Sequence, residues 1–134
     1  MQVVLSNKPE EKRKLLAALE EFAQSNQLPP SVVQAADLSL EEHVTNVMNY
    51  GYNDALAHEI IVRFAVEDQE FVLEIEDDGK PFNPLAKAMV DTSVPLEEKP
   101  IGGLGIHLIR QFMDTLRYRR ENDRNILHLR KRLK

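Results

Sequence analysis

The apolar residues of this chain recur at the period of a helix in some segments and at the period of a strand in others, and the order of these segments limits the folds that the chain can adopt. The predicted elements are, in order, a short strand at Val3–Leu5, a helix from about Pro9 to Ser25, a helix from about Ser31 to Gly51, strands at His58–Val66 and Glu70–Asp77, a third helix opening at Gly102–Gly105, and strands at Thr115–Arg120 and Asn125–Leu133. Helices and strands do not alternate, which argues against a doubly wound parallel sheet. The order favours an α+β sandwich with helices on one face of a mixed or antiparallel sheet.

Local signals indicate where the first two helices should begin and end. Asn7 and Glu10 have the spacing of a capping box around Pro9, a residue favoured in a first helical turn. Ser31 or a neighbour is expected to cap the second helix, which should stop near Gly51. The apolar face predicted for the first helix comprises Leu15, Leu16, Leu19, Phe22 and Ala23.

Length and composition narrow the class of protein. At 134 residues the chain is expected to form a single domain, 1–134, around one core. Its net charge of −5 argues against nucleic acid as the main partner. The absence of cysteine excludes disulfides and thiolate metal sites, and it is compatible with a reducing cytoplasm. No signal peptide or membrane-spanning run is expected, so we predict a cytoplasmic protein without membrane contact.

Positive charge is concentrated at the C-terminal end. From Arg117 onward there are eight basic and two acidic residues. Two explanations remain open. Lys and Arg on terminal strands discourage pairing between the sheet edges of different molecules, or this surface docks an acidic partner.

The stretch at residues 41–52 carries a polar pair on an otherwise apolar helix. Glu42 and Asn46 are four residues apart, so they stand over one another one helical turn apart. Together with Asn49 they should lie opposite an apolar stripe made of Val33, Ala36, Leu40, Val44 and Val47. Such a pair alone is most typical of a solvated helix face, and its functional interpretation depends on two later motifs.

The second predicted strand places a carboxylate on the buried side of the sheet. Phe71, Leu73 and Ile75 point to one side, and the period of two puts Asp77 with them. A buried unpaired charge is costly, so Asp77 should either cap a local turn or receive hydrogen bonds from a ligand. Gly79, two residues later, would allow close approach of another backbone.

A long connection then leads to a glycine-rich helix start. Lys80–Ile101 holds four of the seven prolines, with a possible helical turn around Leu85–Met89, and we expect it to be a mobile lid. Glycines at Gly102–Gly105 stand where the third helix begins, a place where free backbone N–H groups and the helix dipole can bind phosphate. The apolar face expected for this helix comprises Leu108, Ile109, Phe112 and Met113.

Each of these motifs is common, but together their order and spacing resemble the GHKL ATPase superfamily of gyrase, the chaperone ATPases and histidine kinases. Glu42–Asn46 is similar to the N-box, Asp77–Phe82 to a first glycine box of the form D-x-G-x-P-F, and Gly102–Gly105 to the second glycine box. Within the superfamily, the anti-sigma factor serine/threonine kinases and related anti-sigma regulatory factors are the most similar. The resemblance covers nearly the whole chain and implies a two-layer sandwich with a mixed, mostly antiparallel sheet.

The resemblance also implies roles for individual residues. Asn46 would ligate Mg²⁺, and Glu42 would be the general base. Asp77 would accept a hydrogen bond from the adenine amino group, and Gly79 would make room for the base. The remaining nucleotide-binding residues implied are Phe82, Lys99, Gly102, Gly103, Leu104 and Gly105, of which the backbone of the last three would hold phosphates. These roles agree with chemistry, because Mg²⁺ prefers oxygen ligands and a carboxylate can accept from an amine.

Three positions differ from the pattern of the serine kinases. Ile101 stands where they carry a basic residue, and Lys99 is its nearest replacement. His43 follows the N-box Glu where a small residue is usual, and Tyr50 stands where a His is frequent. We expect His43 to be packed or solvated rather than catalytic, and we expect the same of His107.

The function that the resemblance implies is an ATP- and Mg²⁺-dependent protein serine kinase that also sequesters a sigma factor. Its substrate would be an anti-sigma antagonist protein of the STAS type, and a PP2C-type phosphatase would act in the same pathway. A homodimer is also implied. Two alternatives remain open: a non-catalytic, nucleotide-gated binding module of the same fold, and the ATPase half of a histidine kinase. The second is disfavoured because no helix pair with a phosphoacceptor His is expected before the domain.

Overall fold

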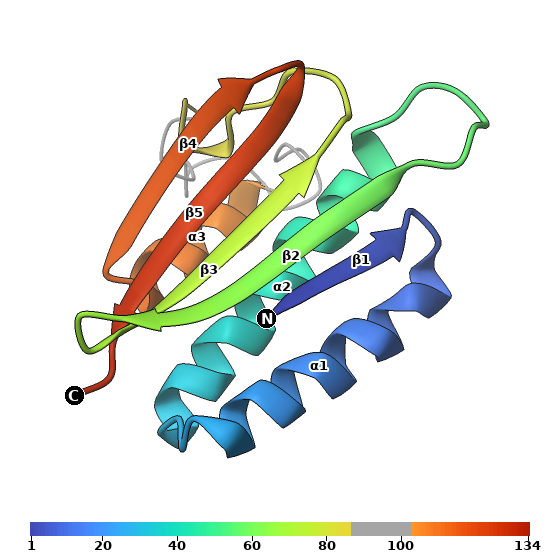
Figure 1. Ribbon diagram of the computed structural model, residues 1–134. Coiled ribbons are helices and arrows are strands. Elements are labelled where there is room, and N and C mark those ends of the chain that lie inside the picture. Colours follow the sequence, from blue (N-terminus) through green and yellow to red (C-terminus); the bar gives the residue numbers. More distant parts are fainter. Residues whose placement is uncertain (87–102) are drawn as a thin grey trace.

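The computed structural model describes residues 1–86 and 103–134, and Figure 1 shows the path of the chain. The elements are β1 (Gln2–Ser6), the 3-10 helix η1 (Pro9–Glu11), α1 (Lys12–Ser25), α2 (Pro30–Tyr50), β2 (Glu59–Glu67), β3 (Glu70–Asp77), the 3-10 helix η2 (Pro84–Ala86), α3 (Gly103–Phe112), β4 (Thr115–Glu121) and β5 (Arg124–Arg132). The predicted order of helices and strands is confirmed. No helix in the described part of the chain is both long and apolar enough to cross a bilayer.

The strands form one sheet in the order β1-β2-β3-β5-β4. All four pairings within the described residues are antiparallel, in agreement with the expected mixed or antiparallel sheet. The last strand does not stay at the edge, because β5 turns back and inserts between β3 and β4. As a result Asp77 at the end of β3 lies opposite Asn125 at the start of β5.

Two tight turns fix the register of the two hairpins. Asp68 and Gln69 join β2 to β3, and Asn122 and Asp123 join β4 to β5; all four have positive φ angles, between 53° and 63°. Two-residue turns with both central residues left-handed match the twist of antiparallel strands. Both hairpins therefore form at the positions that the alternation pattern predicts.

Helices α1, α2 and α3 cover one face of the sheet, which forms the second layer (Figure 1). The core between the layers contains Leu15, Leu19 and Phe22 of α1, the buried side of α2 and the inward residues of the strands. Phe22 packs against Phe64 and Phe71, with ring centroids 5.6 and 6.0 Å apart. Leu16, predicted for the apolar face of α1, is instead 43% exposed.

The predicted helix caps are wrong in both cases. Pro9 opens the short helix η1, so α1 begins only at Lys12 and no side chain caps either N-terminus. Asn7 instead bonds across the fold, where its Oδ1 accepts from His58 N at 3.1 Å. Likewise α2 begins at Pro30 after Pro29, without a side-chain cap from Ser31. In both places a proline makes the cap dispensable, because it sets a helical φ and brings no N–H to satisfy.

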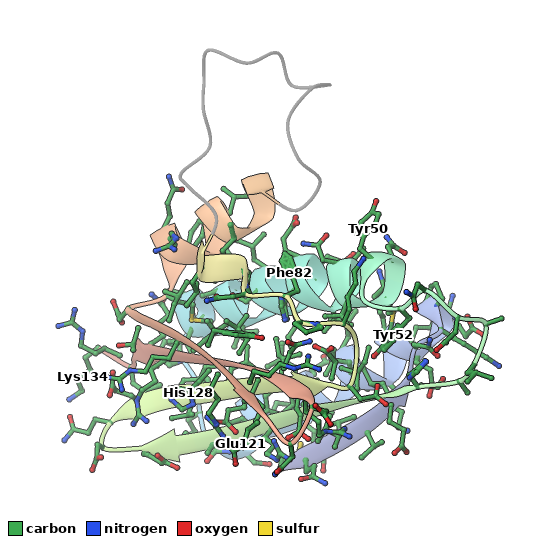
Figure 2. The ribbon with its side chains drawn as sticks, turned by 90° about the horizontal axis from the view of Figure 1, so that it is seen from above. Tyr50, Tyr52, Phe82, Glu121, His128 and Lys134 are labelled. Atoms are coloured by element: carbon green, nitrogen blue, oxygen red, sulfur yellow. The ribbon has the colours of Figure 1, made fainter. Side chains whose placement is uncertain are left out.

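The face of the sheet that the helices do not cover carries a network of ion pairs. Arg119 and Arg124 of the basic C-terminal hairpin contact Glu74 and Glu76 of β3, and Arg130 donates to Glu70 at 3.1 Å. Figure 2 shows Glu121 and His128 on this side, away from the helices. Much of the C-terminal positive charge is therefore neutralised by the acidic strand beside it, and an effect on edge pairing or on docking stays a prediction.

Candidate nucleotide-binding site

A cavity of about 330 Å³ lies between α2, the end of β3, η2, α3 and the start of β5. Cofactor pockets typically hold roughly 300–1,000 Å³. Tyr50 and Phe82 contribute to its wall and lie on the helix side of the sheet (Figure 2). The buried lining residues are His43, Val47, Asp77, Pro84, Ile106, Ile109 and Asn125, and the more exposed ones are Asn46, Tyr50, Gly51, Lys80 and Phe82. The cavity thus has a mostly apolar floor and a polar mouth.

One stripe of α2 forms a wall of the cavity. His43, Asn46, Val47 and Tyr50 recur at helical spacing and all line it. Asn46 therefore sits beside apolar Val47 rather than on an opposite, solvated face, which corrects the expected division of this helix. Glu42 lies one turn before Asn46 and is half-buried, but it is not part of the lining.

Asp77 is the buried acid at the floor of the cavity and is 2% exposed, as the alternation pattern predicts. Its Oδ1 accepts from Gly79 N at 2.9 Å and from Asn125 Nδ2 at 3.0 Å. Burial raises the pKa of this carboxyl, while these two hydrogen bonds oppose the rise. Asp77 therefore caps the local turn, which confirms one of the two expected roles and leaves the ligand role as a prediction.

Asn125 is the residue that sequence reasoning missed. It is 6% exposed, and its Nδ2 donates to Asp77 Oδ1 and, at 2.9 Å, to the carbonyl oxygen of Lys80. Its Oδ1 accepts from Tyr118 Oη at 2.6 Å, from Arg120 Nη1 at 3.0 Å and from Phe82 N at 3.2 Å. The side-chain amide of Asn125 thus forms hydrogen bonds with β3, with β4 and with the segment after Gly79. The sequence held one signal that could have identified Asn125, namely a polar residue at an inward-facing position of the last strand.

Gly79 is required by a close approach of two backbones. A Cβ at this position would lie 2.6 Å from the carbonyl oxygen of Gly51, which is closer than real side chains come. Lys80 N donates to that same oxygen at 2.9 Å. The expectation of close backbone approach at Gly79 is confirmed, and the approaching segment is the end of α2.

The second glycine motif is only partly within the described residues. Gly103, Leu104 and Gly105 form the first turn of α3, so they lie at a helix N-terminus as predicted. Lys99 and Gly102 lie outside the described residues, as does most of the predicted lid Lys80–Ile101. Of that segment, the short helix η2 covers the start of the helical turn expected around Leu85.

A histidine joins the connection after α2 to the end of β3. His58 Nε2 lies 2.7 Å from Asp54 Oδ1, and its Nδ1 lies 3.2 Å from Asp78 Oδ1. The Tyr52 ring stacks on the imidazole with centroids 4.1 Å apart. The hydrogen bond with Asp54, followed by that with Asp78, raises the pKa of His58. The protonated imidazole can donate to both carboxylates, and the neutral one to only one of them.

The stability of the protein should therefore fall at alkaline pH through His58. The pKa of His58 in the folded protein lies above its ordinary value. The stabilisation that protonated His58 gives the folded state is therefore fully present below the ordinary pKa, and it is lost as pH rises through the folded-state pKa. We expect the melting temperature of the wild type to drop more between about pH 6 and about pH 8.5 than that of His58→Gln, which cannot titrate there. Parallel melting curves for the two proteins across this range would contradict the assignment.

Comparisons with known proteins find relatives among anti-sigma factors. The chain is 28% identical over 92 residues to an anti-sigma F factor of Thermoanaerobacter sp. (strain X514), covering 67% of this chain and 64% of the relative. It is 29% identical to the serine-protein kinase RsbW of Oceanobacillus iheyensis, covering 63% and 56%. A longer match, 25% identical over 126 residues, links it to an anti-sigma F factor of Clostridium acetobutylicum, covering 88% and 87%. The chain thus spans a little under two thirds of the Thermoanaerobacter relative.

Solved structures support the fold. A Mycobacterium tuberculosis protein with RsbU and RsbW domains superposes with a TM-score of 0.67 at 14% identity, covering 98% of this chain and 32% of that one. A blue-light activated histidine kinase of Erythrobacter litoralis superposes with a TM-score of 0.54 at 18% identity, covering 78% of this chain and 46% of that one.

The family model for the histidine kinase-like ATPase domain matches residues 5–131, which includes all the elements that surround the cavity. The chain belongs to the histidine kinase-like ATPase domain family.

Proposed function

We propose that this chain is an ATP-binding anti-sigma regulatory factor that phosphorylates a serine of an anti-sigma antagonist protein and sequesters a sigma factor. It would act as a single domain over residues 1–134. The observation that carries the proposal is a cavity with a buried carboxylate, Asp77, on its floor, an amide, Asn46, at its mouth, and the N-terminal turn of α3 beside it. An adenine base, a metal and phosphates each find a suitable group there.

The floor suits the base. Asp77 presents a buried acceptor for an exocyclic amine, and it is held in place by hydrogen bonds from Gly79 and Asn125. Val47, Ile106 and Ile109 give the apolar surface against which a flat ring can pack. Phe82 at the mouth would close over it.

The mouth suits phosphates and Mg²⁺. Within residues 1–86 and 103–134 no three His, Asp or Glu side chains are arranged to hold a metal ion. That fits Mg²⁺, which usually keeps waters and takes few protein ligands when it is bound with nucleotide phosphates. Asn46 would supply one oxygen ligand, and the ion would neutralise phosphate charge. The backbone N–H groups at Gly103, Leu104 and Gly105 would hold phosphates at the start of α3.

Glu42 would be the general base of the transfer. It stands on α2 one turn before Asn46, so a serine hydroxyl brought to the γ-phosphate beside the metal would come within its reach. Its carboxylate would orient the hydroxyl and take its proton as the bond from the serine oxygen to the γ-phosphorus forms and the bond from the γ-phosphorus to the β–γ bridging oxygen breaks, so that ADP leaves. Lys99 and Gly102 would add contacts to the phosphates, and both roles stay predictions.

The names of the relatives support the choice of partners, since they are anti-sigma F factors and a serine-protein kinase. We infer a sigma factor and a STAS-type antagonist as partners, with a PP2C-type phosphatase reversing the phosphorylation. We further infer a homodimer that works in the cytoplasm.

Incubation with γ-labelled ATP, Mg²⁺ and the candidate antagonist encoded beside this chain tests the proposal. We expect label on one serine of the antagonist, and none when that serine is replaced by alanine. If the chain binds ATP and a partner in a nucleotide-dependent way but labels nothing, it is the non-catalytic binding module instead. If it binds no nucleotide, both interpretations are wrong.

A further inference from the structure

His43 is a buried polar side chain whose hydrogen-bonding capacity is unused. It lies on α2, is 8% exposed and lines the floor of the cavity. Among the described residues it has no hydrogen-bond partner. Among the described residues, Tyr52 Oη is the fully buried side-chain polar atom that lacks a hydrogen bond, and the ring nitrogens of His43 are not among such atoms. They therefore reach the open space of the cavity, where a ligand can form hydrogen bonds with them.

The other polar groups of the floor are already engaged. Asn125 uses both amide hydrogens and receives three bonds on its oxygen, and Asp77 Oδ1 receives two. An incoming ligand would therefore find His43, together with the rest of the Asp77 carboxylate, available for hydrogen bonding. Burial lowers the pKa of His43 to about 4, so the imidazole is neutral near pH 7 and offers one N–H donor and one acceptor nitrogen.

The depth of His43 indicates which part of a nucleotide it meets. It is buried together with Val47, Ile109 and Asp77, whereas Asn46 and Tyr50 are more exposed. A charged triphosphate keeps its solvation best at the mouth, while a flat aromatic base gains most from the apolar floor. His43 therefore faces the base rather than the phosphates.

We propose that His43 is a specificity-determining residue, whose imidazole N–H donates to a ring nitrogen of the bound adenine while Asp77 accepts from its exocyclic amine. This inference rests on the proposed function, because it requires an adenine nucleotide in the cavity. His43 and Asp77 would together recognise one acceptor and one donor on the same base. Guanine, with an acceptor oxygen in place of the amine, would meet the Asp77 carboxylate unfavourably.

The test is a double-mutant cycle, in which the hydrogen bond is removed once by changing the protein and once by changing the nucleotide. Binding of ATP and of its 1-deaza, 3-deaza and 7-deaza analogues is measured by calorimetry for the wild type and for His43→Leu. With the wild type, we expect one analogue to bind roughly tenfold more weakly than ATP. His43→Leu should lose a similar factor with ATP and nothing further with that analogue, because the bond can be lost only once.

Controls separate this role from packing. Val47→Ala alters the same floor without removing a polar group, so it should weaken ATP and all three analogues alike. His43→Leu should melt no lower than the wild type, because it replaces a polar side chain that has no partner among the described residues with an apolar one; if it fails to fold, His43→Phe, which also lacks a donor, takes its place in the cycle. If the affinity lost through His43→Leu and the affinity lost through the analogue simply add for all three analogues, His43 does not bond the base. Nucleotide binding itself would still stand. Absence of ATP binding by the wild type would instead overturn the proposed function.

Discussion

Replacing Asp77 with asparagine should weaken ATP binding by roughly 100-fold or more while the protein stays folded. Asn125 Nδ2 and Gly79 N both donate to Oδ1 of this residue, so the oxygen of an asparagine must stay with them. Its NH₂ group then takes the other carboxylate position and faces the adenine amine, donor against donor. The loss comes from that mismatch as well as from the missing charge.

The fold should tolerate this substitution. Burial raises the pKa of Asp77, which means that the ionised carboxylate is held at some cost, and asparagine removes the charge while keeping the cap. We expect an unchanged or higher melting temperature together with the lost calorimetric signal. Asp37→Asn, an exposed change on α2, should alter neither the melting temperature nor ATP binding. ATP binding by Asp77→Asn within a few-fold of the wild type would show that Asp77 does not bind the base.

Glu42→Gln should reduce phosphoryl transfer to the antagonist by roughly 100-fold or more. Glutamine keeps the size and polarity of the side chain but cannot take a proton from the serine hydroxyl. ATP binding should hardly change, since Glu42 does not line the cavity. Asn46→Ala should instead weaken both binding and transfer, because without the metal the phosphate charge is uncompensated.

Glu41→Gln is the matched control for the base. Glu41 is the preceding residue of α2, is exposed and pairs with Lys12 at 3.4 Å on the outside of the helix layer. Its replacement should leave transfer at the level of the wild type. Full transfer by Glu42→Gln would assign the base to another residue.

Much of this fold follows from local patterns. The alternation of β3 predicts that Asp77 is buried with Leu73 and Ile75, because neighbouring side chains of a strand point to opposite faces. The end of α2 near Gly51 is likewise local. These two features depend on the chain within a few residues of each position, so a single sequence can predict them; the need for a glycine at Gly79 is also visible in the sequence, but the backbone that approaches it, that of Gly51, is brought there by the fold.

The features that sequence reasoning missed depend on distant residues. Asn125 meets Asp77 only because β5 inserts between β3 and β4, and no local pattern fixes that strand order. The link of His58 to Asp78 similarly joins residues 20 positions apart. His43 was expected to be packed or solvated, and it is packed, but only the position of α3 over α2 makes it part of a cavity wall.

Isothermal titration calorimetry of the whole chain with ATP, in the presence and absence of Mg²⁺, tests the central claim most directly. We predict saturable binding of one nucleotide per chain that tightens when Mg²⁺ is added and weakens sharply in Asp77→Asn. The absence of any binding heat or competition up to millimolar ATP or ADP, with Mg²⁺ present and the protein folded, would contradict it.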